Sequence, residues 1–95
     1  MRIQHQQNGS KGIFFIEEDN KQLAEMTYTI AAPDILIIDH TEVDDLLRGK
    51  NVGFTLVTHA AGFAREHNYR IIPLCPFAKA IMEKNNSLFT DVLKH

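Results

Sequence analysis

The order strand, turn, helix, strand in the middle of the chain most constrains what this sequence can fold into. An apolar run at residues 35–38 leads into a polar, glycine-containing turn at residues 39–53. An amphipathic segment, residues 52–67, and a second apolar run, residues 69–74, follow. Two strands joined by one crossover helix are usually parallel, with a right-handed connection. The sequence therefore predicts a βαβ unit whose two strands end at the same edge of a sheet.

The predicted helix over residues 52–67 repeats its apolar side chains at helical spacing. These recur at i, i+4, i+8, i+11, i+12 and i+15 and form one face, made of Val52, Leu56, Ala60, Phe63, Ala64 and His67. Gly62 lies inside this segment and costs a helix about 1 kcal/mol relative to alanine. The glycine indicates either that another segment packs closely against the helix at this position or that the helix simply tolerates it.

Strands are predicted on the amino-terminal side of this unit. Residues 22–31 alternate, with Ala24, Met26, Tyr28 and Ile30 on one face, as in a half-buried antiparallel strand. Residues 13–16 are β-prone, and residues 1–7 are expected to form a short edge strand. The expected fold class is therefore α/β (α+β), a mixed and mostly antiparallel sheet flanked by helices.

After the second apolar run, Pro76 is expected at the first position of a helix over residues 76–84, with Cys75 as its N-cap. Residues 85–87 are predicted to break this helix, and residues 88–93 to form a last short one.

Length and composition limit the class of protein. Ninety-five residues, 44% of them hydrophobic, are enough for one domain with a modest core, spanning residues 1–95. The formal net charge of −2 argues against a nucleic-acid partner. One cysteine excludes an internal disulfide and fits a reducing compartment. With no visible signal peptide and no long apolar run, we expect a cytoplasmic protein that does not bind a membrane.

The topology predicts where function resides. Ligands of open α/β sheets bind outside the carboxyl ends of the strands, so residues 40–43, residues 48–53 and Cys75 are expected to lie together. The N–H groups at a helix start also form an anion site. Simple alternation places His40 on the same strand face as Leu36 and Ile38.

Each of these features also has an ordinary structural interpretation. The glycine turn is common in surface loops, Cys75 is consistent with a buried core residue, and His40 with a hydrogen-bonded structural histidine. A cysteine at a helix start is expected to have a lowered pKa. His5, His59, His67 and His95 show no metal-ligand spacing with one another or with the cysteine, so we predict no metal.

Three motifs in order resemble one branch of the GNAT acetyltransferase superfamily. They are His-Thr-Glu-Val at residues 40–43, Leu-Arg-Gly-Lys-Asn-Val-Gly at residues 47–53, and Pro-Leu-Cys-Pro-Phe at residues 73–77. The branch is that of small single-domain acetyltransferase-like proteins, and the likeness covers nearly the whole chain. It implies fourth and fifth strands that splay apart, with the pantetheine arm of acetyl-CoA between them.

The resemblance also implies residue roles. The superfamily signature for acetyl-CoA, Gln/Arg-x-x-Gly-x-Gly/Ala, is matched by Arg48 and Gly53, while Asn51 replaces the middle glycine. Asparagine is the next residue most tolerant of positive φ. The implied acetyl-CoA-binding residues are Thr41, Glu42, Val43, Arg48, Gly49, Lys50, Asn51, Val52 and Gly53. His40 and Cys75 are the implied reactive groups.

We therefore expect an acetyl-CoA-binding protein that transfers acetyl to an amine, of a protein, a peptide or a small molecule. His40, or a water that it orients, would accept the amine proton. Cys75 would protonate the departing thiolate or itself carry the acetyl group. The alternative is a non-catalytic CoA-binding or protein-interaction module. The residues identify neither the acceptor nor the oligomeric state.

Overall fold

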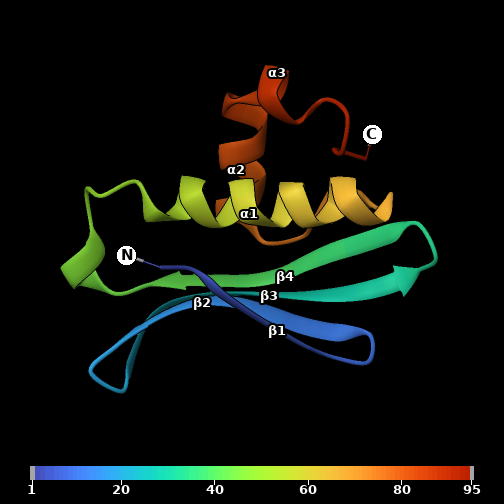
Figure 1. Cartoon of the computed structure of the whole chain (residues 1–95). Helices are drawn as coiled ribbons and strands as arrows, with labels where there is room; N and C mark the ends of the chain where they lie inside the picture. The colour runs from blue at the N-terminus through green and yellow to red at the C-terminus, as the bar shows by residue number, and fades with distance from the viewer. Residues whose placement is uncertain (1, 95) are drawn as a thin grey trace.

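Five strands form a single sheet in the order β1-β2-β3-β4-β5 in the computed structural model, which describes residues 2–94 (Figure 1). The first four strands pair antiparallel, whereas β4 and β5 are parallel. The elements in chain order are β1 (Gln4–Asn8), β2 (Lys11–Glu18), β3 (Lys21–Ala32), β4 (Ile35–Val43), the 3-10 turn η1 (Asp45–Leu47), α1 (Val52–His67), β5 (Arg70–Pro73), α2 (Pro76–Lys84) and α3 (Asn86–Phe89). The predicted mixed sheet and its parallel βαβ unit are confirmed.

Tight turns join the antiparallel strands. Gly9 (φ 64°) turns β1 into β2, and the consecutive Asp19 and Asn20 (φ 53° and 63°) turn β2 into β3. Two successive residues with positive φ match the twist of a two-residue hairpin, and asparagine and aspartate tolerate this conformation best. The predicted edge strand at residues 1–7 corresponds to β1, which begins at Gln4; Met1 lies outside the described residues.

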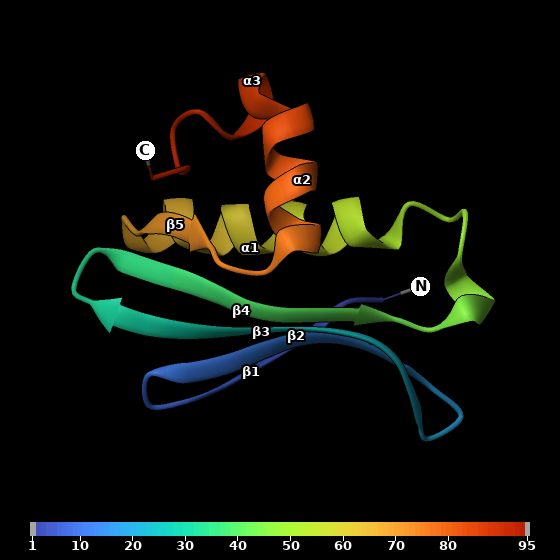
Figure 2. The ribbon, with the colours of Figure 1, turned by 180° about the vertical axis from the view of Figure 1, so that it is seen from behind.

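The helices cover one face of the sheet and leave the other face open, as the two opposite views show (Figures 1 and 2). We call these the helix-covered face and the outer face. The helix-covered face carries the core, because Ala24, Met26 and Tyr28 of β3 and Leu36 and Ile38 of β4 are buried. The alternation predicted for β3 is confirmed.

Helix α1 has the predicted bounds, but its buried face differs from the prediction at one end. Val52, Leu56, Ala60 and Ala64 are buried as expected, whereas His67 is exposed. The last turn of α1 extends past the edge of the core, so apolar periodicity did not determine burial there. A methyl group added at Gly62 would meet no atom, which identifies this glycine as tolerated rather than closely packed.

The carboxyl-terminal segment returns to the sheet instead of forming the expected helix over residues 88–93. Helix α2 ends at Lys84, where a break was predicted, but α3 then covers Asn86–Phe89 and includes two of the three residues predicted to break the helix. Leu93 then forms a β-bridge with Ile71, which places the segment along the outer edge of β5. The predicted helix was wrong because pairing with an open strand edge outweighs the weak helix propensity of a short segment.

A bidentate ion pair holds this return in place. The Arg65 guanidinium of α1 donates to both carboxylate oxygens of Asp91, at 2.6 and 3.1 Å, and to the carbonyl oxygen of Leu88 at 2.8 Å. The hydrogen bonds from Arg65 hold the pKa of Asp91 below its usual value. Within residues 2–94, no helix is long and apolar enough to cross a membrane.

Candidate functional site

A pocket of about 760 Å³ opens beside the carboxyl end of β4. Its walls come from β4, from the turn between β4 and α1, from the first residues of α1 and from one side of α2. The residues that line it are Thr41, Val43, Leu47, Arg48, Gly49, Asn51, Val52, Gly53, Phe54, Phe77, Ala80, Ile81, Lys84 and Asn85. The βαβ topology thus gathers the pocket from segments that are far apart in sequence.

Strand β4 has a free edge beside this pocket. Strand β5 pairs with it only from Ile35 to Ile38, while β4 continues to Val43. Past that point the amides of Leu74 and Cys75 both donate to the Ile38 carbonyl, at 3.1 and 3.3 Å, as the chain turns away into α2. Within the described residues, the later part of β4 pairs only with β3. Apart from the Thr41 backbone, which interacts with the Cys75 thiol, its other edge has no strand partner and offers its backbone groups to an extended ligand.

The turn before α1 is shaped by local hydrogen bonds and by two residues with positive φ. The Asp44 carboxylate accepts from the Leu46 amide at 2.9 Å and caps η1. Gly49 (φ 78°) and Asn51 (φ 59°, ψ 30°) then adopt the left-handed conformation. Asn51 therefore holds the conformation that was expected at the position of the missing glycine.

Asn51 is the N-cap of α1, yet its side chain makes no capping hydrogen bond. The first N–H groups of an α-helix have no acceptor within the helix and carry partial positive charge. Val52 and Gly53, the first two residues of α1, line the pocket. The pocket therefore ends at an uncapped helix start that is suited to a phosphate group.

A β-bulge at Asp39 changes which way the end of β4 faces. Tyr28 pairs with Ile38, but the preceding Thr27 pairs with His40, so Asp39 is an extra residue on β4. A bulge of this kind turns the following side chains to the opposite face. His40 therefore lies on the outer face, opposite Thr27. The prediction that His40 shares a face with Leu36 and Ile38 was wrong, because simple alternation does not anticipate an inserted residue.

The same bulge turns Thr41 and Val43 into the pocket. Thr41 pairs with the fully buried Met26, and its buried hydroxyl oxygen forms no hydrogen bond of ordinary geometry among the described residues, although it lies near the Cys75 thiol. A buried hydroxyl without a partner is costly. Because Thr41 lines the pocket, a ligand with an acceptor or donor atom at this wall would complete its hydrogen bonding.

Cys75 is the N-cap of α2, as predicted, with Pro76 at the first helical position. The residue is 7% exposed and belongs to the core, beside the pocket rather than in its lining. Burial raises the pKa of the Cys75 thiol, but interactions with the backbone amides of Ala78 and Phe77 and with Thr41 outweigh burial and hold the pKa below its usual value. The site therefore raises the fraction of thiolate at a given pH relative to a free cysteine.

Seven of the nine predicted acetyl-CoA-binding residues line the pocket, namely Thr41, Val43, Arg48, Gly49, Asn51, Val52 and Gly53. Glu42 and Lys50 do not. Glu42 follows the bulge on the outer face with His40, and Lys50 is exposed between the two positive-φ residues. The prediction that residues 40–43 lie beside the turn is therefore correct for the side chains of Thr41 and Val43, and not for those of His40 and Glu42.

One wall of the pocket comes from α2 and was missed in the sequence. Phe77, Ile81 and Lys84 line it, and their spacing of four and three residues identifies one face of a helix. A methyl group at Gly53 would collide with the Phe77 ring, so α1 and α2 pack closest at this glycine. The helical spacing was visible, but nothing in the sequence showed that this face meets the start of α1.

His40 lies beside two carboxylates on the outer face. Its Nε2 atom is 3.5 Å from Oε1 of Glu42 and 3.9 Å from Oε2 of Glu25. Comparing histidine and cysteine spacings did not reveal this group, because Glu25 belongs to a different strand.

Comparison with known proteins identifies the fold and the family. Residues 13–92 match the family model described as GCN5-related N-acetyl-transferase. The chain is 39% identical to a GCN5-like N-acetyltransferase candidate from Staphylococcus aureus, with a TM-score of 0.75 over 96% of this chain and 87% of the other. Among curated proteins, none matches the chain significantly.

More distant structures share the fold alone. They include the ribosomal-protein-S18-alanine N-acetyltransferase from Escherichia coli, at 15% identity and a TM-score of 0.68 over 83% of this chain. A predicted acetyltransferase with acetyl-CoA from Clostridium acetobutylicum gives 16% identity and a TM-score of 0.66 over 80% of this chain. The present chain spans only 54% and 56% of these two proteins.

Proposed function

The chain belongs to the GCN5-related N-acetyltransferase family, and on that basis we propose that it binds acetyl-CoA in the β4 pocket and transfers the acetyl group to an amine. One observation carries the proposal. The free edge of β4, the positive-φ turn and the uncapped start of α1 line a single pocket. An extended arm that ends in phosphates matches this combination of backbone donors, acceptors and partial positive charge.

The phosphate groups of acetyl-CoA would lie at the start of α1. The backbone N–H groups of Val52 and Gly53 would donate to the phosphate oxygens, with Asn51 and Gly49 holding the turn open around them. Arg48 also lines the pocket, and its guanidinium now pairs with Asp45 at 3.0 Å. Both side chains are exposed, so exchanging that carboxylate for a phosphate costs little.

The residues of the pocket fit the pantetheine arm on two grounds. The backbone of β4 from Asp39 to Val43 has a free edge for hydrogen bonds to the amides of the arm. The buried Thr41 hydroxyl, which forms no hydrogen bond of ordinary geometry within the described residues, would gain one from a bound ligand. Glu42 and Lys50 would contribute through their backbone alone, because their side chains do not line the pocket.

Acetyl-CoA, when bound, supplies a thioester for attack by an amine. His40 would accept the proton that the amine loses, directly or through a water, from the outer face of the sheet. An acceptor would then approach from the face opposite the pocket and meet the acetyl group at the free edge of β4. Glu25 and Glu42 beside His40 would favour an acceptor that carries positive charge.

Cys75 would act from the point where β4 and β5 separate. Two roles remain open, protonating the thiolate that leaves or attacking the thioester as a nucleophile. The lowered pKa of the thiol raises the fraction of thiolate at a given pH, and the thiolate is the form that attacks as a nucleophile.

A second candidate function is non-catalytic binding of CoA. Cys75 is buried beside the helix-covered pocket, whereas His40 is on the outer face, and the chain spans little more than half of the enzymes with the same fold. A thiol-release assay separates the candidates. We expect amine-dependent release of CoA thiol from acetyl-CoA, lost in both His40→Ala and Cys75→Ser.

Mass spectrometry after incubation with acetyl-CoA separates the two roles of Cys75. A nucleophile leaves a hydroxylamine-sensitive acetyl group on the cysteine, whereas a proton donor leaves none. Binding of CoA without amine-dependent thiol release, for all classes of amine offered, would favour the non-catalytic function. His59→Ala, which alters an exposed histidine away from the pocket, is the matched control and is expected to keep full activity.

A further inference from the structure

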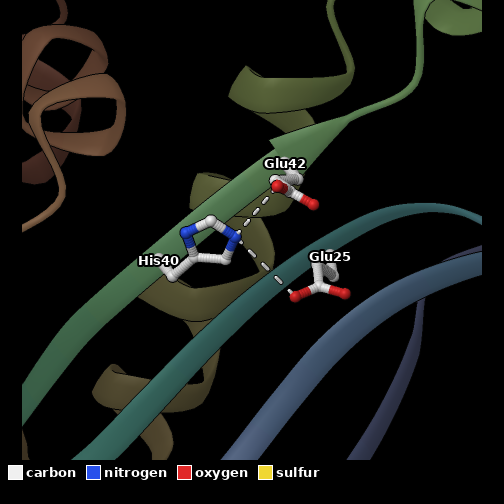
Figure 3. A group of neighbouring side chains, drawn as sticks. All are labelled: Glu25, His40 and Glu42. Atoms are coloured by element: carbon white, nitrogen blue, oxygen red, sulfur yellow. Dashed lines mark ion pairs between the residues drawn. The ribbon is translucent and has the colours of Figure 1, made fainter.

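Three metal-ligating side chains converge on the outer face of the sheet. Figure 3 shows His40 and Glu42 extending from β4 and Glu25 from β3, with the same imidazole nitrogen facing both carboxylates. One ligand atom from each residue lies within 4.8 Å of the other two. In a tetrahedral site with metal–ligand bonds of about 2.1 Å, the ligand atoms lie roughly 3.4 Å apart. Small side-chain rotations would bring these atoms to that spacing.

From this convergence, we propose that Glu25, His40 and Glu42 bind a divalent transition-metal ion, with Zn²⁺ as the best match. One imidazole nitrogen and two carboxylate oxygens suit zinc and its neighbours, whereas calcium and magnesium prefer oxygen ligands alone. The three protein ligands leave a fourth position for water or another ligand.

The backbone holds the three residues in this arrangement. The bulge at Asp39 places His40 on the outer face, and Glu42 follows two residues later on the same face. Glu25 pairs directly with Glu42 across the strands. Two like charges at opposed positions repel each other, and a cation bound between them would relieve this repulsion.

Among the described residues, no lysine or arginine side chain forms an ion pair with Glu25 or Glu42. The ion pairs of Glu25 and Glu42 involve His40 only, and the nearby ammonium of Lys21 pairs with Asp44 at 3.8 Å. A bound metal ion would neutralise both carboxylates at once.

A neighbouring side chain already orients one ligand. The amide of Gln22 donates to Oε1 of Glu25, which leaves Oε2 directed toward His40. Hydrogen bonds of this kind fix the ligands of metal sites. The His40 and Glu42 side chains are exposed, which gives the open coordination position access to solvent.

One consequence rests on the proposed function, although the metal site itself does not. The metal would occupy Nε2 of His40, the atom proposed to accept the amine proton. Metal binding and acetyl transfer would therefore exclude each other at this residue, and Zn²⁺ would act as a reversible inhibitor.

Calorimetric titration of Zn²⁺ into the tag-free full chain tests the site. We expect one ion per chain, and an affinity that falls at least about 10-fold in His40→Ala and in Glu25→Gln. Gln22→Ala should also weaken binding, by about 10-fold, through loss of the orienting hydrogen bond. His59→Ala and Glu66→Gln, which change exposed residues of α1, are the controls and should bind as the parent does.

Absence of Zn²⁺ binding up to millimolar concentration would overturn the proposal. So would binding that survives His40→Ala and Glu25→Gln, or that is lost only in Cys75→Ser. Nitrogen-15 spectra of the imidazoles provide a second measurement, in which added Zn²⁺ should shift Nε2 of His40 and leave His59 unchanged. A protein that binds Zn²⁺ in this way but does not bind CoA would support the metal site and contradict the proposed function.

Discussion

At the residue scale, Asn51 and Asp39 shape the site. Asn51 takes the left-handed conformation that ends the turn and begins α1. Asp39 is the extra residue of the bulge, held by the Thr29 hydroxyl, which donates to its carboxylate at 2.6 Å. The role of Asn51 was predictable, because only glycine tolerates positive φ more readily. The bulge was not, because an inserted residue leaves no mark on an alternating pattern.

Substitution of Asn51 tests its conformational role. Alanine at φ 59° is strained, so Asn51→Ala should lower the free energy of unfolding by about 1 kcal/mol, whereas Asn51→Gly should leave it unchanged or raise it slightly. Urea denaturation measures both. Equal losses in the two variants would show that the amide side chain of Asn51, and not its backbone conformation, is what matters.

The buried Tyr28 predicts a loss of stability in alkali. Its side chain is 1% exposed, and its hydroxyl lies 2.6 Å from Nε2 of His5. Burial, helped by Tyr69, raises the pKa of Tyr28 from 10.0 to about 12. Between these two values the unfolded chain releases a proton that the folded protein keeps. The stability is therefore complete below pH 10 and declines as the pH rises toward 12, by roughly 3 kcal/mol.

Urea midpoints over a series of pH values measure this decline. The Tyr69→Phe variant leaves Tyr28 as the one tyrosine, so tyrosinate absorbance then reports its titration alone. Titration of Tyr28 at its ordinary pKa of 10.0 would contradict its burial.

At the element scale, the sequence predicted the elements better than the contacts between them. The bounds of α1 and α2 follow from apolar periodicity, from Pro76 and from the stop at Asn68, and all of these are local signals. The carboxyl-terminal return and the α2 wall of the pocket depend on contacts between distant segments. Local periodicity and helix-end signals contain no information about these particular contacts, and therefore both were missed.

Two glycines of α1 should respond to alanine with opposite signs. Gly62 faces open space, so Gly62→Ala should raise the free energy of unfolding by about 1 kcal/mol through helix propensity. At Gly53 a methyl group would collide with the Phe77 ring, so Gly53→Ala should lower it by roughly 1 kcal/mol. Urea denaturation compares the variants.

The Phe77→Ala background provides the control for this pair. Removing the ring should relieve most of the penalty of Gly53→Ala and leave only the contact with the Ile81 side chain, 3.0 Å from the added methyl group, while the gain from Gly62→Ala should persist. A penalty at Gly53 that stays undiminished without the ring would mean that the Phe77 ring is not its cause.

At the scale of the whole molecule, the βαβ topology was the strongest prediction. It brought the end of β4, the turn and the start of α2 to one edge, and the pocket is there. It could not say which side chains enter the pocket, because the inserted residue at Asp39 shifts the alternation of the strand by one position. Thr41 and Val43 enter, while His40 and Glu42 face the opposite side. Two chemically distinct surfaces thus meet at one free strand edge.

The central claim is that acetyl-CoA binds along this free edge with its phosphates at the start of α1. Titration of the nitrogen-15-labelled protein with acetyl-CoA, followed by amide chemical shifts, tests it most directly. We expect the largest shifts at residues 49–53 and 39–43, small shifts in the β1–β2 hairpin, and weaker binding by Arg48→Ala. Absence of shifts at millimolar acetyl-CoA, or shifts concentrated away from these two segments, would contradict it.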